Sequence, residues 1–277
     1  MEIGLYTVLT DQTMLPGVAA KLIEDAGFDA MSVGEHSHIP SRRETPYPGG
    51  DGELPDGYAR TLDLFVVFTA AALATTRLRM ESSIIQIAQR DPITTAKEAA
   101  SVDYLSGGRL DLIAGHGWNV EEIRNHGVDP ERRYDVVRER ILAIREIWGN
   151  DVATFHGEFV DFDEIWSWPK PVQPGGVRII LGGNSPGSEE RALEYGDGWA
   201  PINGPGIRER VAAFTAANPG VPVHVAGVPS DPAVIAAFAE AGTTRAMLTL
   251  GLAYAGEAER TLEELRRTVD VAVGSAR

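Results

Sequence analysis

The stretch Leu105-Ser-Gly-Gly-Arg-Leu-Asp-Leu-Ile-Ala-Gly-His-Gly-Trp118 indicates, in order, a helix end, a turn, a buried strand and a glycine-rich loop. The pair Gly107-Gly108 permits the left-handed turn that ends a helix. Residues 110–114 form an apolar run of strand length, apolar enough to be covered on both faces as in a parallel sheet. The following Gly115-His116-Gly117 would let a flat ligand approach the backbone closely. A strand that ends in such a loop is typical of ligand sites in α/β proteins.

Strands alternate with helices along the whole chain, a pattern that indicates parallel βα units. The predicted strands are residues 3–9, 30–33, 78–87, 110–114, 177–181, 199–202, 223–226 and 246–250. The predicted helices are 15–26, 62–74, 92 to about 104, 131–148, 187–195, 207–217, 232–241 and 257–273. No Pro/Gly/Ser-rich linker divides the sequence. We therefore predict an α/β fold, a (β/α)8 TIM barrel forming a single domain over residues 1–277.

Insertions follow the second and the fourth predicted strands. Residues 37–60 are rich in Pro, Gly, Arg and Asp, and loops this long are usually lids or binding loops. We expect this segment to cover the C-terminal mouth of the barrel. Residues 154–162 predict a hairpin with its turn at Gly157, and we expect Trp166 and Trp168 to pack beneath that insertion.

Composition narrows the possible partners. The 277 residues are 43% hydrophobic and include no cysteine, which excludes disulfides, thiolate metal sites and a cysteine nucleophile. A net charge of −15 argues against nucleic acid and anionic membranes as partners. The N-terminus enters a strand without a basic leader, and no apolar run reaches membrane-spanning length. We expect a cytoplasmic protein that binds small molecules.

Glu35 and His36 follow the second predicted strand, where a barrel places catalytic groups. An imidazole there can donate or accept a proton. Glu35-His36-x-His38 is also compatible with a metal site, because residues i and i+2 share one face of a strand. Further ligands would have to come from His116 or His224, which have no Asp or Lys arranged around them in the sequence. A metal-dependent barrel hydrolase is therefore an alternative.

Four motifs, in order, resemble the bacterial-luciferase-like superfamily of TIM barrels, whose members bind flavin or the deazaflavin coenzyme F420. They are the segment 81–92 with its Arg90-Asp-Pro92 exit, Ser106–Leu110 followed by Gly115–Trp118, Gly182-Gly183-Asn184, and Gly196-Asp-Gly-Trp199. The resemblance implies the F420-dependent oxidoreductase branch, a small-molecule substrate and a homodimer. Sugar-phosphate dehydrogenases of that branch carry a Glu where this chain has Trp118, so a sugar-phosphate substrate is not carried over.

The resemblance also implies roles for individual residues. His36 would face the coenzyme ring as a proton donor or acceptor or would orient that ring, and Glu35 would fix the His36 tautomer. A non-prolyl cis peptide bond maps to Ser83–Ile84 and would bulge against the ring. The loop residues Gly115, His116, Gly117 and Trp118 would line the coenzyme pocket.

The segment 179–190 places glycines between a strand and a helix N-terminus, an arrangement that binds anions. Together with the resemblance, it predicts that Gly182, Gly183 and Asn184 hold the phosphate of the coenzyme tail. Arg42 and Arg43 in the long loop either clamp an anionic group or are solvated.

The predicted function is hydride transfer between coenzyme F420 and a small organic substrate. An FMN-dependent monooxygenase of the same superfamily is the first alternative, and the metal-dependent hydrolase is the second. A flavin-binding protein without turnover is a third.

Overall fold

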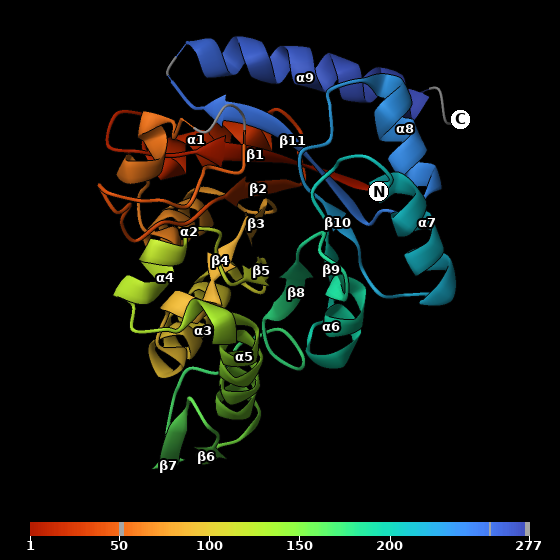
Figure 1. Cartoon of the computed structure of the whole chain (residues 1–277). Helices are drawn as coiled ribbons and strands as arrows, with labels where there is room; N and C mark the ends of the chain where they lie inside the picture. Colours follow the sequence, from red (N-terminus) through yellow and green to blue (C-terminus); the bar gives the residue numbers. More distant parts are fainter. Residues whose placement is uncertain (50–52, 255, 275–277) are drawn as a thin grey trace.

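The computed structural model describes residues 1–49, 53–254 and 256–274. Within these ranges, one parallel sheet curls into a nearly closed barrel with helices on its outside (Figure 1). The strands, in their order around the barrel, are β10 (His224–Val225), β11 (Arg245–Leu252), β1 (Glu2–Val8), β2 (Ala30–Val33), β3 (Arg79–Ser82), β5 (Leu110–Gly115), β8 (Arg178–Gly182) and β9 (Gly198–Ala200). Two isolated parallel bridges, Trp199 to Val223 and Ile202 to Ala226, link β9 back to β10. The predicted barrel is confirmed.

The helices are α1 (Pro16–Asp25), α2 (Leu64–Ala74), α3 (Pro92–Ser106), α4 (Val120–Asn125), α5 (Arg133–Gly149), α6 (Ser188–Tyr195), α7 (Ile207–Ala217), α8 (Pro232–Glu240) and α9 (Glu257–Gly274). Short 3-10 helices occur at η1 (Asp56–Arg60), η2 (Ile87–Gln89) and η3 (Pro130–Arg132). The sequence did not predict α4, which is a six-residue helix too short to show a periodic pattern.

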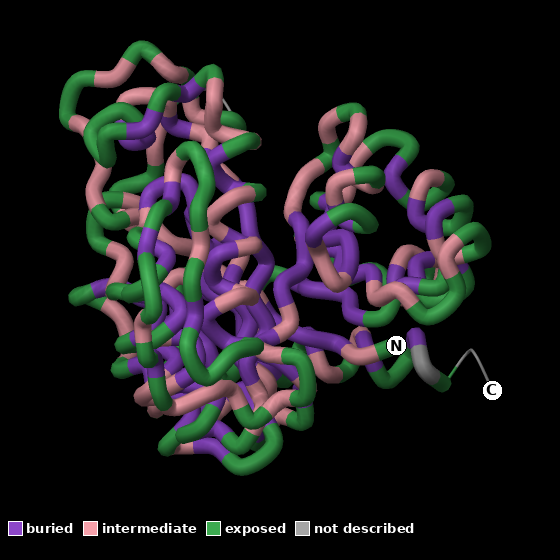
Figure 2. Tube along the Cα trace, turned by 90° about the horizontal axis from the view of Figure 1, so that it is seen from below, coloured by how far each residue is buried: buried purple, intermediate pink, exposed green. Residues whose placement is uncertain are grey.

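Residues 105–118 fold as the sequence predicts. Gly107 has φ +66° and ends α3, and its N–H returns to the carbonyls of Asp103 and Tyr104. The six residues of β5 that follow are all buried. At the other end of α3, the Asp91 carboxylate accepts the N–H of Thr94 at 2.7 Å, and Pro92 occupies the first turn. Buried residues concentrate along the strands and the inner faces of the helices (Figure 2).

The third predicted strand, 78–87, is divided into two pieces. β3 ends at Ser82, and β4 (Ile85–Gln86) resumes the pairing with β5. The peptide bond between Ser83 and Ile84 is cis, as the resemblance implies. That prediction is confirmed.

The hairpin after the fourth barrel position consists of β6 (Ala153–His156) and β7 (Asp161–Ile165) and extends away from the barrel (Figure 1). In its turn, the Gly157 N–H donates to the Val160 carbonyl at 2.9 Å. Trp166 and Trp168 are 80% and 57% exposed, so the prediction that they pack beneath the insertion was wrong. Their position beyond the projecting hairpin leaves these two side chains largely open to solvent.

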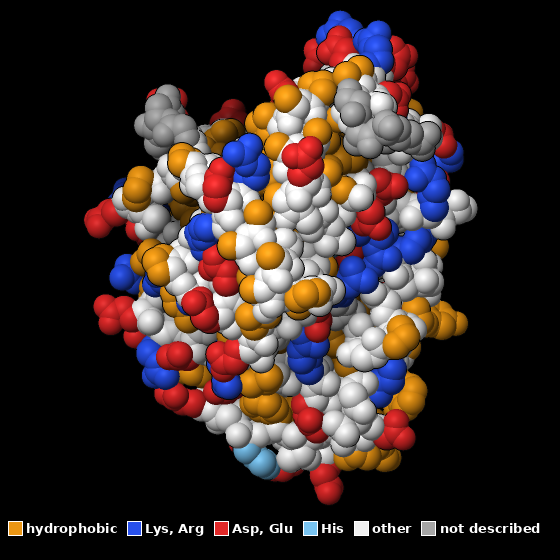
Figure 3. Space-filling model, turned by 90° about the vertical axis from the view of Figure 1, so that its right-hand side faces the viewer, with side chains coloured by type: hydrophobic (Ala, Val, Ile, Leu, Met, Phe, Trp, Pro, Cys, Tyr) orange, Lys and Arg blue, Asp and Glu red, His pale blue; other side chains and the backbone are white. Residues whose placement is uncertain are grey.

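The barrel interior holds a cluster of buried ionic groups near the amino ends of the strands. Arg79 donates to both Asp111 oxygens at 2.8 and 2.9 Å, and Arg245 bonds Asp111 at 2.9 Å and Glu81 at 2.5 Å. On the outer face shown in Figure 3, acidic and basic side chains lie intermingled. None of the described helices is both long and apolar enough to cross a membrane.

Candidate functional site

A cavity of about 560 Å³ opens at the carboxyl ends of the barrel strands. Its lining includes Tyr47, Pro48, Gly49 and Tyr58 from the segment 37–60, which therefore covers the mouth of the barrel as predicted. Residues 50–52 of that segment lie outside the described residues. The predicted site residues that line the cavity are Glu35, His36, Ser83, Ile84, Gly115, His116, Gly117, Trp118, Gly182 and Gly183.

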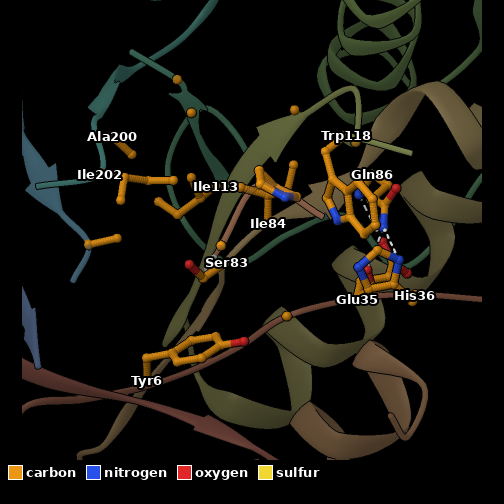
Figure 4. Close-up of a pocket in the computed structure, with 18 of the residues that line it drawn as sticks. Tyr6, Glu35, His36, Ser83, Ile84, Gln86, Ile113, Trp118, Ala200 and Ile202 are labelled. Carbon is orange, nitrogen blue, oxygen red and sulfur yellow. Dashed lines mark hydrogen bonds between the residues drawn. The ribbon is translucent and has the colours of Figure 1, made fainter. Parts of the chain in front are cut away.

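Polar and apolar walls face each other across this cavity. Figure 4 shows Glu35, His36, Gln86 and Trp118 gathered on one side and Ile113, Ala200 and Ile202 on the other, with Ser83 and Ile84 between them. The apolar wall comes from the ends of β5 and β9 and was not predicted, because Ile113, Ala200 and Ile202 look like ordinary barrel-core residues in the sequence.

His36 is held by Glu122. The His36 Nδ1 lies 2.9 Å from the Glu122 Oε2, the imidazole is 8% exposed and the carboxylate is fully buried. The Gln86 amide nitrogen lies 3.2 Å from the same Nδ1. A carboxylate accepts a hydrogen bond from Nδ1–H, and this bond assigns the proton-accepting role to the other ring nitrogen, Nε2.

Glu35 does not fix the His36 tautomer, so that prediction was wrong. The Glu35 Oε1 accepts from the Arg90 Nε at 2.6 Å, and its Oε2 accepts the Gln86 N–H at 2.8 Å. Arg90 also bonds Glu98 at 2.9 Å and Asp63 at 3.1 Å. Glu35 thus anchors the chain just after the Ser83–Ile84 bond. The sequence could not identify Glu122 as the partner, because it lies 86 residues from His36.

Aromatic rings surround His36 under the lid. Tyr58 and Trp118 lie 5.3 and 5.9 Å from its ring centroid, and Tyr47 lies 5.1 Å from Tyr58 and 5.8 Å from Trp118. The Tyr47 and Tyr58 hydroxyls are 2.9 Å apart. Burial, reinforced by this hydrogen bond, raises the pKa of Tyr58, so its hydroxyl stays protonated. Arg43 lies outside the described cavity lining, with its guanidinium 5.5 Å from the Trp118 ring.

The glycines at the opening of the cavity leave space that neighbouring side chains of the protein occupy. A Cβ on Gly115 would lie 2.5 Å from the Ile84 Cδ1, and one on Gly182 would lie 3.2 Å from the Ile84 Cγ2. The space beside Gly117 is taken by the Gln86 side chain. These glycines line the cavity, and the absence of side chains on them admits Ile84 and Gln86 to its wall.

The residues predicted to bind a phosphate make hydrogen bonds within the protein. The Asn184 amide bonds both the N–H and the carbonyl of Ile202, at 2.8 and 2.7 Å, and Asn184 is absent from the described lining. The Gly183 N–H donates to the Ala200 carbonyl at 3.1 Å. The Asn184 side chain and the Gly183 N–H are thus bonded within the protein, and the role of Gly182, Gly183 and Asn184 in holding a phosphate stays a prediction. Their bonds tie the β8 loop to the strand beside it.

An arginine lies next to this loop. The Arg191 Nη2 donates to the Ser185 Oγ at 3.0 Å and to the Ser188 Oγ at 3.3 Å, at the start of α6. Its guanidinium lies 4.6 Å from the Tyr134 ring, which packs 4.8 Å from His116. Burial, with Arg133 and Arg191 nearby, lowers the pKa of His116 and favours its neutral form. The sequence showed Arg191 only as a helix residue.

The histidines do not converge as the metal alternative requires. His38 bonds the Ser37 hydroxyl and the Asn125 amide, each at 2.9 Å, and it lies outside the described cavity lining. Within residues 1–49, 53–254 and 256–274, no group of three or more His, Cys, Asp or Glu side chains could hold a metal ion.

Comparison with known proteins agrees with this geometry. A family model described as luciferase-like monooxygenase matches residues 18–221. An uncharacterized protein of Mycobacterium tuberculosis is 36% identical over 277 residues, which cover 96% of this chain and 97% of the relative.

Two solved structures share the fold at under 20% identity. The monooxygenase RslO1 from Streptomyces bottropensis has a TM-score of 0.78 and 16% identity, with both chains covered completely. An F420-dependent secondary alcohol dehydrogenase, in complex with an F420–acetone adduct, has a TM-score of 0.73 and 18% identity, with 98% of each chain covered. On the match of the family model and the near full-length relative, this chain belongs to the luciferase-like monooxygenase family, a family of oxidoreductases.

Proposed function

We propose that this protein transfers a hydride between coenzyme F420 and a small, uncharged organic substrate. The observation that carries the proposal is His36, an imidazole in the cavity wall whose Nδ1 is fixed by a buried carboxylate. Oxidation of an alcohol removes one hydride and one proton, and reduction of a carbonyl adds both. A barrel that leaves hydride chemistry to a coenzyme needs one proton-transferring group of its own.

The residues present fit a planar coenzyme with a phosphorylated tail. A volume of about 560 Å³ is in the range of small-molecule sites. The apolar wall of Ile113, Ala200 and Ile202 suits the face of a ring. At the β8–α6 loop, Arg191 with Ser185 and Ser188 supplies a cation and two hydroxyls suited to a phosphate.

His36 and its surroundings account for the remaining chemistry. When bound, the deazaflavin ring supplies the hydride acceptor or donor. His36 Nε2 accepts the hydroxyl proton as an alcohol is oxidised, or returns it to the carbonyl oxygen in the reverse direction. Glu122 keeps the ring in the tautomer that can do so. Tyr47, Tyr58 and Trp118 shield this point from water beneath the lid.

The lining also narrows the substrate class. No Lys or Arg occurs among the described residues that line the cavity. A substrate phosphate or carboxylate held there would be buried without a compensating cation, which is costly. The proposal therefore names neutral alcohols and carbonyl compounds.

An FMN-dependent monooxygenase is the second candidate, supported by the family description and by the fold likeness to RslO1. A fluorescence titration of the purified protein with F420 and with FMN separates the two when it is followed by turnover under nitrogen and in air, with oxidised F420 or with chemically reduced FMN supplied. We expect F420 binding and oxygen-independent reduction of F420 by a neutral alcohol. Binding of FMN alone, with substrate oxidation that requires oxygen, would establish the second candidate instead.

A further inference from the structure

A second imidazole held by a carboxylate lies deeper in the same cavity. His224 begins β10 and is 1% exposed, and its Nδ1 lies 2.6 Å from the Glu81 Oε2. Glu81 comes from β3 and is 2% exposed, and the same oxygen accepts from the Arg245 Nη1 at 2.5 Å. Both His224 and Glu81 line the cavity. We call these two residues the cavity floor.

The other nitrogen of this imidazole has no partner in the part of the chain that the structure describes. The His224 Nε2 is buried and makes no hydrogen bond there. A buried polar atom left unpaired destabilises a protein, and most such atoms in native structures are paired. The coenzyme and phosphate contacts considered above do not involve His224. The unpaired atom therefore points to a ligand at the cavity floor.

The surrounding charges determine what this nitrogen offers. Arg79 and Arg245 are both bonded to Asp111, and Arg178 lies 3.7 Å from it. Arg245 is also bonded to Glu81 and Glu2, so three cations face three carboxylates. A charged imidazole would add a further buried charge to this balanced group. With a neutral ring donating Nδ1–H to Glu81, the His224 Nε2 is a hydrogen-bond acceptor.

We propose that the His224 Nε2 accepts a hydrogen bond from an N–H or O–H of the molecule that fills the cavity. This inference rests on the proposed function, because that molecule is either the coenzyme ring or the substrate. The imide N–H of a flavin or deazaflavin ring and a second, non-reacting hydroxyl of the substrate present the same donor chemistry. Ile202 and Ala226, which also line the cavity, are apolar, so one polar contact here would set how deeply the ligand sits.

The test uses His224→Asn. The asparagine amide can still donate to Glu81 from a position close to that of Nδ1, but it removes Nε2. His156→Asn, on the exposed hairpin, is the matched control. Affinities for F420 and FMN are measured by fluorescence titration without substrate, together with the absorption spectrum of the bound ring. The KM for a diol is measured separately, and circular dichroism checks the fold of each variant.

If the ring supplies the donor, His224→Asn weakens coenzyme binding about tenfold and shifts the bound spectrum. If the substrate supplies it, coenzyme affinity is unchanged and the KM rises about tenfold. Either result supports the acceptor role. Unchanged coenzyme affinity together with an unchanged KM overturns it.

A ligand-side experiment covers the case in which the variant fails to fold. For a ring donor, the native protein binds FMN methylated on its imide nitrogen about tenfold more weakly than FMN. Equal binding of the two, with an unchanged KM for a diol methylated on its non-reacting hydroxyl, overturns the inference. A native protein that binds neither F420 nor FMN is a different result. It overturns the proposed function, and the basis of this inference with it.

Discussion

The His36–Glu122 pair joins residues 86 positions apart at one wall of the cavity. His36 follows β2, whereas Glu122 lies in the first turn of α4, whose N-cap Asn119 accepts the Glu122 N–H. The second carboxylate oxygen, Glu122 Oε1, is buried and has no partner among the described residues. A buried carboxylate with an unpaired oxygen destabilises the folded protein unless its partner can carry a positive charge. His36 gains that charge when it accepts a proton.

Replacing His36 should slow the chemical step without weakening coenzyme binding. General acid–base assistance is typically worth about 10²–10⁴-fold in rate, so His36→Asn should lower kcat by that order. Affinity for the coenzyme should change little, as measured by fluorescence titration. His38→Asn is the control, because His38 lies outside the described lining of the cavity. Equal kcat values for the His36 variant and the native protein would mean that the proton comes from another group.

Replacing Glu122 tests its positioning role. Glu122→Gln keeps the shape but removes the charge that stabilises a protonated His36, so kcat should fall about 10–100-fold with unchanged coenzyme affinity. The double variant with His36→Asn should be no slower than His36→Asn alone, because Glu122 acts only through His36. Losses in kcat that multiply in the double variant would contradict this role. The pH profile of kcat should also change in Glu122→Gln.

The loop between β8 and α6 shows what the sequence could predict of the site and what it could not. Its glycines and helix start were visible as an anion-binding pattern, and Gly182 and Gly183 do line the cavity. The use of Asn184 to hold Ile202 was not visible, because the two residues meet only when β9 lies beside β8. The cis bond at Ser83–Ile84 followed from resemblance alone, since periodicity favours an unbroken strand.

Arg191 should contribute to binding through the coenzyme phosphate. Charge-assisted hydrogen bonds are worth about 1.5–3 kcal/mol, so Arg191→Ala should weaken FMN binding about 10–100-fold. Riboflavin, which has the same ring and no phosphate, should bind the variant and the native protein equally. Arg208→Ala, at an exposed arginine of α7, is the control. An equal loss for both ligands would assign Arg191 to the ring or to the fold.

The lid is attached to α4 by a carboxylate. The Glu121 Oε1 accepts the N–H groups of Glu44 and Thr45 at 2.9 and 3.2 Å. The hydrogen bond from the Thr45 side chain, followed by those from the backbone, lowers the pKa of Glu121 to about 2. Because the folded pKa lies below the usual value for Glu, this attachment is complete above about pH 4 and is lost as the pH falls towards 2.

Removing this attachment should loosen the lid without unfolding the barrel. In Glu121→Ala, amide hydrogen exchange at residues 44 and 45 should become faster, and the bound coenzyme should dissociate faster. Glu131→Ala, at an exposed turn, is the control for a nearby loss of charge. Unchanged exchange at residues 44 and 45 would show that other contacts hold the lid.

At the scale of the whole molecule, the alternation of strands and helices was sufficient to predict the barrel, whereas its ionic interior was not visible in the sequence. Arg79, Asp111 and Arg245 occur singly in three separate strands and meet only when the sheet closes. Burial alone would raise the pKa of Asp111. Hydrogen bonds from Arg79 and the charge of Arg245 outweigh burial and hold this pKa well below its usual range.

This interior should make stability depend on pH in a defined direction. Burial also tends to raise the pKa of Glu81, but His224 and Arg245 lower it on balance. Both carboxylates bind protons more weakly in the folded chain than in the unfolded chain, where their pKa values are near 4. Their stabilisation is therefore complete above about pH 5, and the free energy of unfolding should fall as the pH drops through 4 towards 2. Urea unfolding at pH 7, 4 and 3 measures this fall.

Asp111→Asn tests the source of that dependence. Removing the Asp111 charge leaves Arg79 and Arg245 with too little negative charge around them. The free energy of unfolding should therefore fall by about 3–5 kcal/mol at pH 7. The variant should then lose less further stability between pH 7 and pH 3 than the native protein, because one of the titrating carboxylates is gone. Asp161→Asn, whose side chain is exposed on the hairpin, should retain the native stability and the native acid dependence. If Asp111→Asn and the native protein lose equal stability over this range, the acid sensitivity comes from carboxylates other than Asp111.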